Sequence, residues 1–326
     1  MSTAERMKAI VYEDYGPPDV LCFREINKPS PTDDEILIKV QAASVTPLDW
    51  HFLTGTPYIA RLMAGLLKPK HKVLGTDVSG IVEAVGENIT QFSPGDEVFG
   101  LSFSNGAFAE YLSMPESELE LVLKPSKISF EDAAATPYSG FTALFCLRDL
   151  GGIQAGQKVL INGASGGTGT FAVQIAKSFG AEVTGVCSTR NLERVLAIGA
   201  DQVIDYTKDD FTNHTEVYDL IFDVVRKRKF SDCRDALKPG GTYVTTEFSP
   251  ALAIQSLWVA NTGDKKLVPL PMKRPTQQDF LDLKELLETG KVKPVIDRKY
   301  KLADVPDALE YIAKGHARGK IVIMIA

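Results

Sequence analysis

The stretch INGASGGTG (Ile161–Gly169) links a short apolar run to a segment with apolar residues at helical spacing. The run Lys158–Asn162 is typical of a strand, and Thr170–Phe179 has the period of a helix. A glycine-rich turn between a strand and a helix lets the backbone approach a phosphate, and the helix N-terminus favours the negative charge. Ala164 stands where the G-x-G-x-x-G pattern has its first glycine, so the turn has to be judged by its context.

Strands and helical segments alternate around this turn. Ser129 is the expected N-cap of a helical segment that reaches Asp149. Further strands are expected at residues 183–187, 202–205, 218–224 and 242–246, with helical stretches between most of them. Such alternation indicates a doubly wound parallel sheet, an α/β fold. Because the turn follows the first strand of this series, its position favours a dinucleotide-binding site.

The first part of the chain and its last segment have a different pattern. Residues 7–122 contain short alternating strands separated by Gly and Pro turns, which indicates a β-rich domain. A closing unit is expected at residues 276–289 (helix), 292–300 (strand), 305–315 (helix) and 320–325 (strand).

Length and composition restrict the class of function. A chain of 326 residues favours two domains over one. The formal net charge of -6 disfavours a nucleic-acid or anionic-membrane partner, and no apolar run reaches membrane-spanning length. The polar first residues lack the apolar core of a secretory signal, so we expect a cytoplasmic protein. The four cysteines lie far apart without a C-x-x-C pair and are expected to be buried thiols.

The end of the strand at residues 183–187 decides which dinucleotide fits. An NAD site has Asp or Glu there, which accepts a hydrogen bond from the ribose 2'-hydroxyl and would repel a 2'-phosphate. Here the strand is followed by Ser188, Thr189 and Arg190, and a guanidinium can hold a phosphate through two hydrogen bonds. The sequence therefore favours NADPH over NADH. The alternative is that Arg190 is an ordinary solvated charge.

The candidate cofactor-binding residues lie on the turn, on this strand end and after the next strand. Gly166 and Gly169 allow close approach of the pyrophosphate and tight packing of the helix. Ser165 offers a hydroxyl to phosphate. Tyr206 can stack on the adenosine or bond to it, and its alternative is an aromatic residue at the edge of the core. The candidates are Ser165, Gly166, Gly167, Thr168, Ser188, Arg190 and Tyr206.

Nearly the whole chain resembles the zinc-free medium-chain dehydrogenases/reductases of the zeta-crystallin-like quinone oxidoreductase group. The resemblance rests on the β-rich first half and on the segments INGASGGTGTFAVQIAKSFGAEVTGVCSTRN, GADQVIDY, YDLIFDVV, LKPGGTYVT and GHARGKIVI. It implies a GroES-like catalytic domain (residues 1–126 and 274–326), a Rossmann domain (residues 127–273) and a cleft where they meet. It also implies a homodimer, for which Lys265–Met272 is the candidate edge strand.

The resemblance implies an NADPH-dependent oxidoreductase. Its substrate would be a small molecule, either a quinone or an α,β-unsaturated carbonyl whose activated C=C accepts hydride. It places Thr142 near the nicotinamide, although this hydroxyl can equally bond to its own helical turn. Two alternatives stay open for the whole protein. One is a catalytically weak NADPH-binding protein with a structural or redox-sensing role, and the other is a zinc-independent alcohol dehydrogenase.

A catalytic zinc ion is not expected. The zinc alcohol dehydrogenases of this superfamily carry G-H-E and a lobe of four cysteines. This sequence has Thr76 and Asp77 where His and Glu would stand, and its cysteines do not form such a lobe. Its histidines share no spacing suited to a tetrahedral ion. Without a Lewis acid, hydride delivery to an electron-poor carbon is favoured over alcohol oxidation.

The segment VTPLDW supplies the candidate catalytic residues by comparison with the group's N-P-x-D pattern. Thr46 replaces the Asn, and its hydroxyl donates with shorter reach, which weakens an oxyanion role. Asp49 matches, and we expect an orienting acceptor rather than a base. Tyr58 and His51 can line the pocket or deliver a proton. For each of them the alternative is an ordinary loop or core residue.

The group has a short glycine-containing loop after the segment that reads FDVV here. In this chain RKRKF (Arg226–Phe230) follows instead. We expect a solvated loop, and the alternative is a basic patch that steers an anionic cofactor.

Overall fold

The computed structural model describes residues 5–104, 106–247 and 249–325. The chain forms two compact units, each described here by itself. The first unit contains Met1–Tyr138, Thr276–Glu288 and Val295–Ala326, and the second contains Ser139–Pro275 and Thr289–Pro294.

The second unit is built around a six-stranded sheet in which all neighbouring strands are parallel. The strand order is β10-β9-β8-β11-β12-β13, the doubly wound order of a Rossmann domain. This confirms the fold class expected from the sequence. The strands are β8 (Lys158–Asn162), β9 (Glu182–Cys187), β10 (Gln202–Asp205), β11 (Tyr218–Asp223), β12 (Leu237–Thr245) and β13 (Lys266–Pro269).

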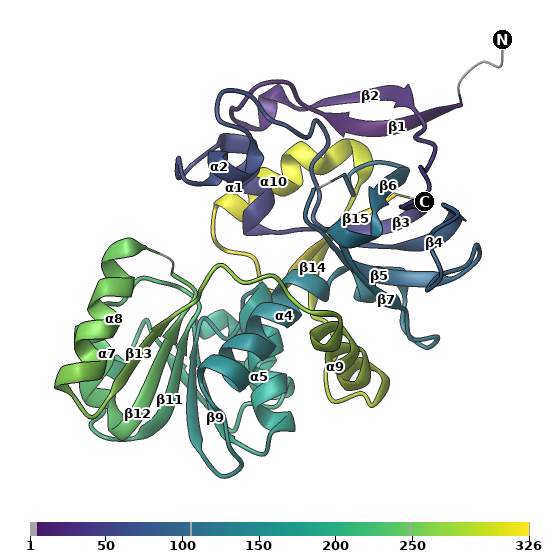
Figure 1. Cartoon of the computed structure of the whole chain (residues 1–326). Coiled ribbons are helices and arrows are strands. Elements are labelled where there is room, and N and C mark those ends of the chain that lie inside the picture. The colour runs from purple at the N-terminus through teal and green to yellow at the C-terminus, as the bar shows by residue number, and fades with distance from the viewer. Residues whose placement is uncertain (1–4, 105, 248, 326) are drawn as a thin grey trace. The chain divides into compact units, whose positions relative to one another are not determined.

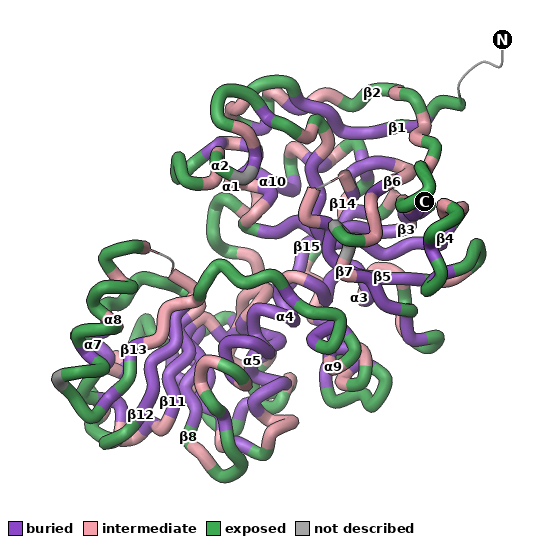
Figure 2. Tube along the Cα trace, in the orientation of Figure 1, coloured by how far each residue is buried: buried purple, intermediate pink, exposed green. Residues whose placement is uncertain are grey.

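Helices lie on both faces of this sheet (Figure 1). The central strands are therefore buried on both sides, as Figure 2 shows, and their nearly continuous apolar sequences, such as VLI and LIF, fit that environment. The helices are α4 (Pro137–Phe145) with a following π-helical turn (Cys146–Leu150), α5 (Gly167–Ser178), α6 (Leu192–Ala197), α7 (Phe230–Cys233) and α8 (Pro250–Thr262).

The first unit contains a seven-stranded sheet of order β14-β15-β3-β4-β5-β7, with β6 also paired to β3. Strand β15 is parallel to β14 and antiparallel to β3, so segments far apart in the sequence form one sheet. The strands are β3 (Glu35–Val45), β4 (Asp77–Val85), β5 (Glu97–Ser102), β6 (Tyr111–Pro115), β7 (Leu119–Leu123), β14 (Ile296–Lys301) and β15 (Lys320–Met324); β1 (Arg6–Val11) and β2 (Cys22–Asn27) form a separate hairpin.

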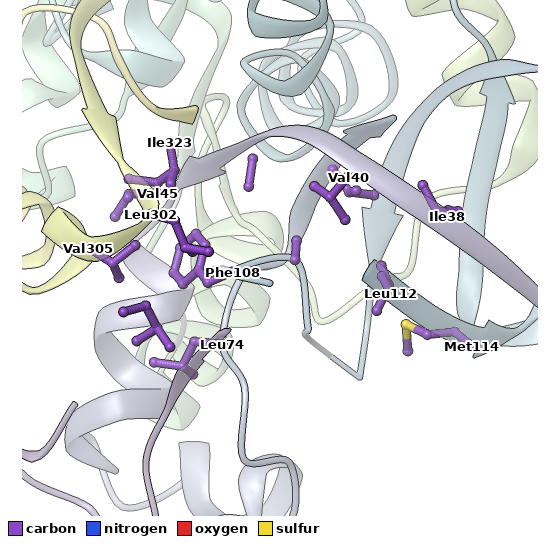
Figure 3. Close-up of a cluster of buried hydrophobic side chains, with 14 of the residues drawn as sticks. Ile38, Val40, Val45, Leu74, Phe108, Leu112, Met114, Leu302, Val305 and Ile323 are labelled. Carbon is purple, nitrogen blue, oxygen red and sulfur yellow. The ribbon is translucent and has the colours of Figure 1, made fainter. Parts of the chain in front are cut away.

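The core of the first unit lies between this sheet and its helices. Alternate residues of β3, such as Ile38 and Val40, belong to one buried cluster with the loop residues Leu74 and Phe108 and the helix residue Val305 (Figure 3). The helices of this unit are α1 (Pro47–Thr54), α2 (Ala60–Ala64), α3 (Phe130–Ala134), α9 (Gln277–Glu288) and α10 (Val305–Ala313). Within the described residues, every helix is too short or too polar to cross a membrane.

The segment after β7 differs from the single helix expected from Ser129 to Asp149. Ser129 does cap α3, because its side chain accepts a hydrogen bond from Asp132 N at 3.1 Å. The helix ends at Ala134 and a new one starts at Pro137, which has no N–H to continue the earlier helix. Helix α3 packs on the sheet of the first unit, so residues 127–138 fall in that unit. The domain limits at 126/127 and 273/274 stay predictions.

Candidate functional site

The glycine-rich turn connects β8 to α5, and Gly166 is the N-cap of the helix. The turn is tight because Gly163 has a φ of +91° and its carbonyl accepts a hydrogen bond from Gly166 N at 3.1 Å. The helix starts at Gly167, three residues before the expected Thr170, so Gly167 and Thr168 lie in its first turn. Among the described residues no side chain caps this N-terminus, so its amides remain available to an anion.

Two glycines of the turn serve different purposes. A Cβ at Gly169 would lie 2.0 Å from Gly163 O, so α5 can pack this closely only with glycine at that position. A Cβ at Gly166 would meet only Gly163 O, at 3.5 Å, among the described atoms. The space above Gly166 is therefore open, which is what a phosphate at the helix N-terminus requires.

A short 3₁₀ turn, Thr189–Asn191, follows β9. Asn191 is buried, and its Nδ2 donates to Ser165 Oγ at 3.1 Å and to Ser188 Oγ at 3.2 Å. Arg190 is exposed, and its guanidinium has no hydrogen-bond or ion-pair partner in the described part of the chain. The structure thus brings two predicted phosphate contacts, Ser165 and Ser188, together through a residue that the sequence analysis did not single out.

A carboxylate lies beside this turn, at the end of β10 rather than β9. Asp205 accepts hydrogen bonds from the Thr189 hydroxyl and from the backbone N–H and hydroxyl of Thr207. The bond from Thr189, followed by those from Thr207, keeps the pKa of Asp205 below its ordinary value. Lys208 Nζ is 3.8 Å from the carboxylate. Next to it, Tyr206 is exposed, with its backbone N–H bonded to Cys187 O, so the ring is open to a ligand.

A second buried carboxylate orders the turn after β11. Asp223 accepts hydrogen bonds from Asn162 Nδ2 at 2.8 Å and from the Tyr243 hydroxyl at 2.7 Å. It also accepts from Val225 N and Arg226 N, and Arg226 has a positive φ of 60°. The four basic residues that begin here are all exposed, as expected for a solvated loop.

In the first unit, Thr46 and Asp49 form a capping box at the start of α1. Asp49 Oδ2 accepts from Thr46 N at 2.7 Å and from Thr46 Oγ1 at 2.8 Å, and Asp49 Oδ1 accepts from Gly75 N at 3.2 Å. Thr46 Oγ1 also lies 3.3 Å from Thr76 Oγ1. The Thr46 hydroxyl is fully buried and bonded inside the protein, so contact between it and a substrate stays a prediction.

Asp77 and Lys320 form a buried ion pair close to this capping box. Lys320 Nζ is 3.1 Å from Asp77 Oδ2, which also accepts from Ser44 Oγ at 2.6 Å. Asp77 Oδ1 accepts from Tyr138 N at 2.9 Å. The position that carries Glu in the zinc enzymes is thus occupied here by a carboxylate with a lysine partner, which sequence spacing alone did not reveal.

Burial has the largest effect on the pKa of Asp49 and on the pKa of Asp77. It raises the pKa of Asp49 from 3.8 to about 7, although the hydrogen bonds from Thr46 oppose the rise and the neighbouring Asp77 adds to it. Burial also raises the pKa of Asp77, and the Lys320 ammonium opposes that rise. The environment of the capping box therefore favours a protonated Asp49 below neutral pH.

The remaining candidates are dispersed. Tyr58 lies between α1 and α2, is 76% exposed and has the Arg61 guanidinium 5.0 Å from its ring centre. His51 Nδ1 lies 2.7 Å from Thr56 O. Thr142 is buried on α4, in the second unit. Groups of three His, Cys, Asp or Glu able to hold a metal ion are not found among the residues that the structure describes.

Substitution of the two turn glycines should separate packing from ligand binding. Gly169→Ala is expected to lower the free energy of unfolding by about 1–3 kcal/mol, because the backbone must move away from Gly163 O. Gly166→Ala is expected to change it by about 1 kcal/mol at most, while weakening dinucleotide binding about tenfold because the methyl group enters the open space. Urea unfolding and fluorescence titration measure the two effects. Unchanged dinucleotide binding in Gly166→Ala would contradict the assignment.

The raised pKa of Asp49 makes stability depend on pH. The native state holds this proton up to about pH 7, whereas an unfolded carboxyl with its ordinary pKa of 3.8 releases it earlier. The native state therefore binds more protons in this window, and the free energy of unfolding falls as pH rises, by about 1.4 kcal/mol per pH unit at most. In Asp49→Asn, unfolding by urea at a series of pH values should show a smaller fall than in wild type.

A matched control exists in α7, where Asp232 makes the same type of capping contact to Lys229 N but is exposed. Asp232→Asn should keep the wild-type pH dependence. Asp77 and Lys320 are present in all three proteins, so the difference reports Asp49. Parallel pH curves for wild type and Asp49→Asn would show that Asp49 carries no such proton.

Comparison with known proteins places the chain in a family. The family described as "Alcohol dehydrogenase GroES-like domain" matches residues 32–126, and the family described as "Zinc-binding dehydrogenase" matches residues 198–323. The quinone oxidoreductase from Coxiella burnetii has a similar structure, with a TM-score of 0.87 and 31% sequence identity over 99% of this chain and 100% of that one.

Two curated relatives match almost the full chain. "NAD(P)H oxidoreductase RTN4IP1, mitochondrial" of Mus musculus is 34% identical, over 98% of this chain and 89% of the relative. "2-methylene-furan-3-one reductase" of Solanum lycopersicum is 33% identical, over 99% and 80%. The likeness supports an oxidoreductase with a nicotinamide cofactor. The chain therefore belongs to the medium-chain dehydrogenases/reductases, in the group of quinone oxidoreductases and enone reductases.

Proposed function

We propose that the protein uses NADPH to reduce a quinone or the activated C=C of an α,β-unsaturated carbonyl, without a zinc ion. One observation carries the cofactor part of the proposal. The uncapped N-terminus of α5 lies beside a strand end that presents Ser188 and Arg190, and Asn191 links the two segments. An anion-binding helix end next to an unpaired guanidinium suits a dinucleotide with a 2'-phosphate.

The residues present fit this cofactor, which supplies a hydride when bound. The amides of Gly167 and Thr168, with the Ser165 hydroxyl, would hold the pyrophosphate. Ser188 and Arg190 would hold the 2'-phosphate. The exposed ring of Tyr206 would contact the adenosine. Among the described residues the Asp205 carboxylate touches this turn, and the Lys208 ammonium, 3.8 Å from it, partly offsets its repulsion of a phosphate.

The choice of acceptor rests on relatives and on chemistry. The printed names of the relatives include a quinone oxidoreductase and a reductase of a methylene-furanone, in which a C=C is conjugated to a carbonyl. Hydride addition to either acceptor leaves negative charge on oxygen. A quinone then takes the proton on oxygen, whereas an enone takes it on the α-carbon to give the saturated carbonyl. Among the catalytic candidates, Tyr58 is exposed, whereas the Thr46 hydroxyl is buried and bonded to Asp49.

Zinc-independent chemistry is supported by the donor set at the position of the zinc ligands. Thr76 offers a neutral hydroxyl group, and Asp77 is already paired with Lys320. Zinc sites in proteins use thiolate, imidazole and carboxylate ligands, so this set is a poor match.

The preference for NADPH is tested at Arg190. Arg190→Ala should reduce the affinity for NADPH about tenfold or more, because a bidentate charged contact to phosphate is lost, and should leave the affinity for NADH nearly unchanged. Thermal shifts with each dinucleotide, supported by fluorescence titration, measure both affinities. Equal affinity of the wild type for NADPH and NADH would overturn the preference.

The reaction is tested by turnover. NADPH should be oxidised only when a quinone or enone is added, and prior treatment with EDTA should leave the rate unchanged. An absorbance assay at constant NADPH with a panel of quinones, enones and simple alcohols measures this. Tight NADPH binding without reduction of any acceptor would favour the alternative function, that of a catalytically weak NADPH-binding protein. Oxidation of simple alcohols with NADP would favour the zinc-independent alcohol dehydrogenase.

Assembly and location remain predictions. Strand β13 is the edge of the second unit's sheet, and its free side can accept a strand from a second copy, as expected for a homodimer. Sedimentation of the purified chain would measure its mass in solution.

A further inference from the structure

The turn Ser188–Asn191 is held from two sides while Arg190 is left free. On one side Asn191 bonds to Ser165 of the glycine-rich turn and to Ser188. On the other side the Thr189 hydroxyl bonds to Asp205 of β10. The two anchors lie on opposite sides of the turn, because β9 lies between β8 and β10 in the sheet.

The side chain of Asn191 contains an unpaired polar atom. Its Oδ1 is buried and has no hydrogen-bond donor among the described residues, and the residue is only 5% exposed. Exchanging the two amide atoms would leave a donor unpaired instead, so the mismatch persists in either orientation. A buried unpaired polar atom weakens the folded state, and such an atom calls for a reason other than stability.

Thr189 supplies the second anchor. Its hydroxyl donates to Asp205 Oδ2 and lies 3.3 Å from Thr207 Oγ1, while Thr207 bonds to the other oxygen of the same carboxylate. The carboxylate thus joins the turn after β9 to the turn after β10. Arg190 and Tyr206, the two exposed candidates for the adenosine end, follow directly after these anchored residues.

We propose that Asn191 and the Thr189–Asp205 pair are positioning residues that hold Ser188 and Arg190 in place for the 2'-phosphate and thereby set the preference for NADPH. This proposal rests on the proposed use of NADPH. The anchors order the turn before the ligand binds. Less conformational entropy is therefore lost on binding, and the affinity for the phosphate is higher. NADH carries only a neutral 2'-hydroxyl at this turn, so its binding depends less on the anchors than the binding of NADPH does.

The experiment compares single variants by the Kd values of NADPH and NADH and by thermal unfolding without ligand. Thr189→Val and Asn191→Ala should each weaken NADPH binding about fivefold or more and change NADH binding by about twofold at most. Thr189→Ser, which keeps the hydroxyl, should restore NADPH binding. Asn191→Ala should keep the unfolding temperature within about 2 °C of wild type or raise it, because it removes the unpaired atom.

A matched control lies a few residues further along the chain. Thr212 bonds to Asp210 Oδ1 through its N–H at 3.1 Å and its hydroxyl at 2.8 Å, the same geometry as Thr207 on Asp205. Thr212→Val removes a threonine–aspartate hydrogen bond outside the turn. It should leave both Kd values unchanged, which separates the effect of the anchor from a general loss of such bonds.

The outcomes distinguish this proposal from the one it rests on. Loss of NADPH affinity in Arg190→Ala, together with wild-type affinity in Thr189→Val and Asn191→Ala, would overturn the positioning role alone. Equal loss of NADPH and NADH affinity in the anchor variants would also overturn it, since the role would then be structural. Unchanged NADPH affinity in Arg190→Ala would overturn the NADPH preference and this inference together.

Discussion

The approach of Gly169 to the Gly163 carbonyl is the constraint on which the nucleotide-binding unit depends. A Cβ at position 169 would lie 2.0 Å from that oxygen, so only glycine lets α5 start directly after β8. That close start leaves the first amides of α5 without side-chain caps at the carboxyl end of the parallel sheet. In doubly wound folds this end of the central strands is where ligands bind. The roles proposed for the exposed Arg190 and the bridging Asn191 depend on the helix beginning there.

The sequence predicts the regular parts of the fold well. Strand β10 occupies residues 202–205 as expected, and α9 and α10 lie within one or two residues of their expected ends, because apolar periodicity marks them clearly. Apolar alternation does not mark strand β2, because its sequence CFREIN is mostly exposed and pairs with β1. Helix α1 was also missed, although the spacing T-x-x-D in VTPLDW was a signal for a capping box.

The sequence predicts the site only at positions where the residue type alone indicates what the residue does. The glycines of the turn and the absence of an acid at the end of β9 can be found from the sequence, because they depend on local order along the chain. The contacts of Asn191 with Ser165 and of Thr189 with Asp205 join positions 26 and 16 residues apart. The buried pair of Asp77 and Lys320 spans 243 positions. Such contacts are set by strand order, which a single sequence does not specify.

The distance in sequence between Asp77 and Lys320 has a consequence for the order of folding during synthesis. Strands β3 and β4 are made early, but the ammonium that compensates the buried Asp77 carboxylate arrives only with β15. Long-range pairing of this kind forms slowly, since a long loop must close before the contact is gained. All six strands of the second unit precede β14 and β15 in the chain. On the ribosome, the sheet of the second unit can therefore form before β15, which pairs with β3 in the first unit, has been synthesised.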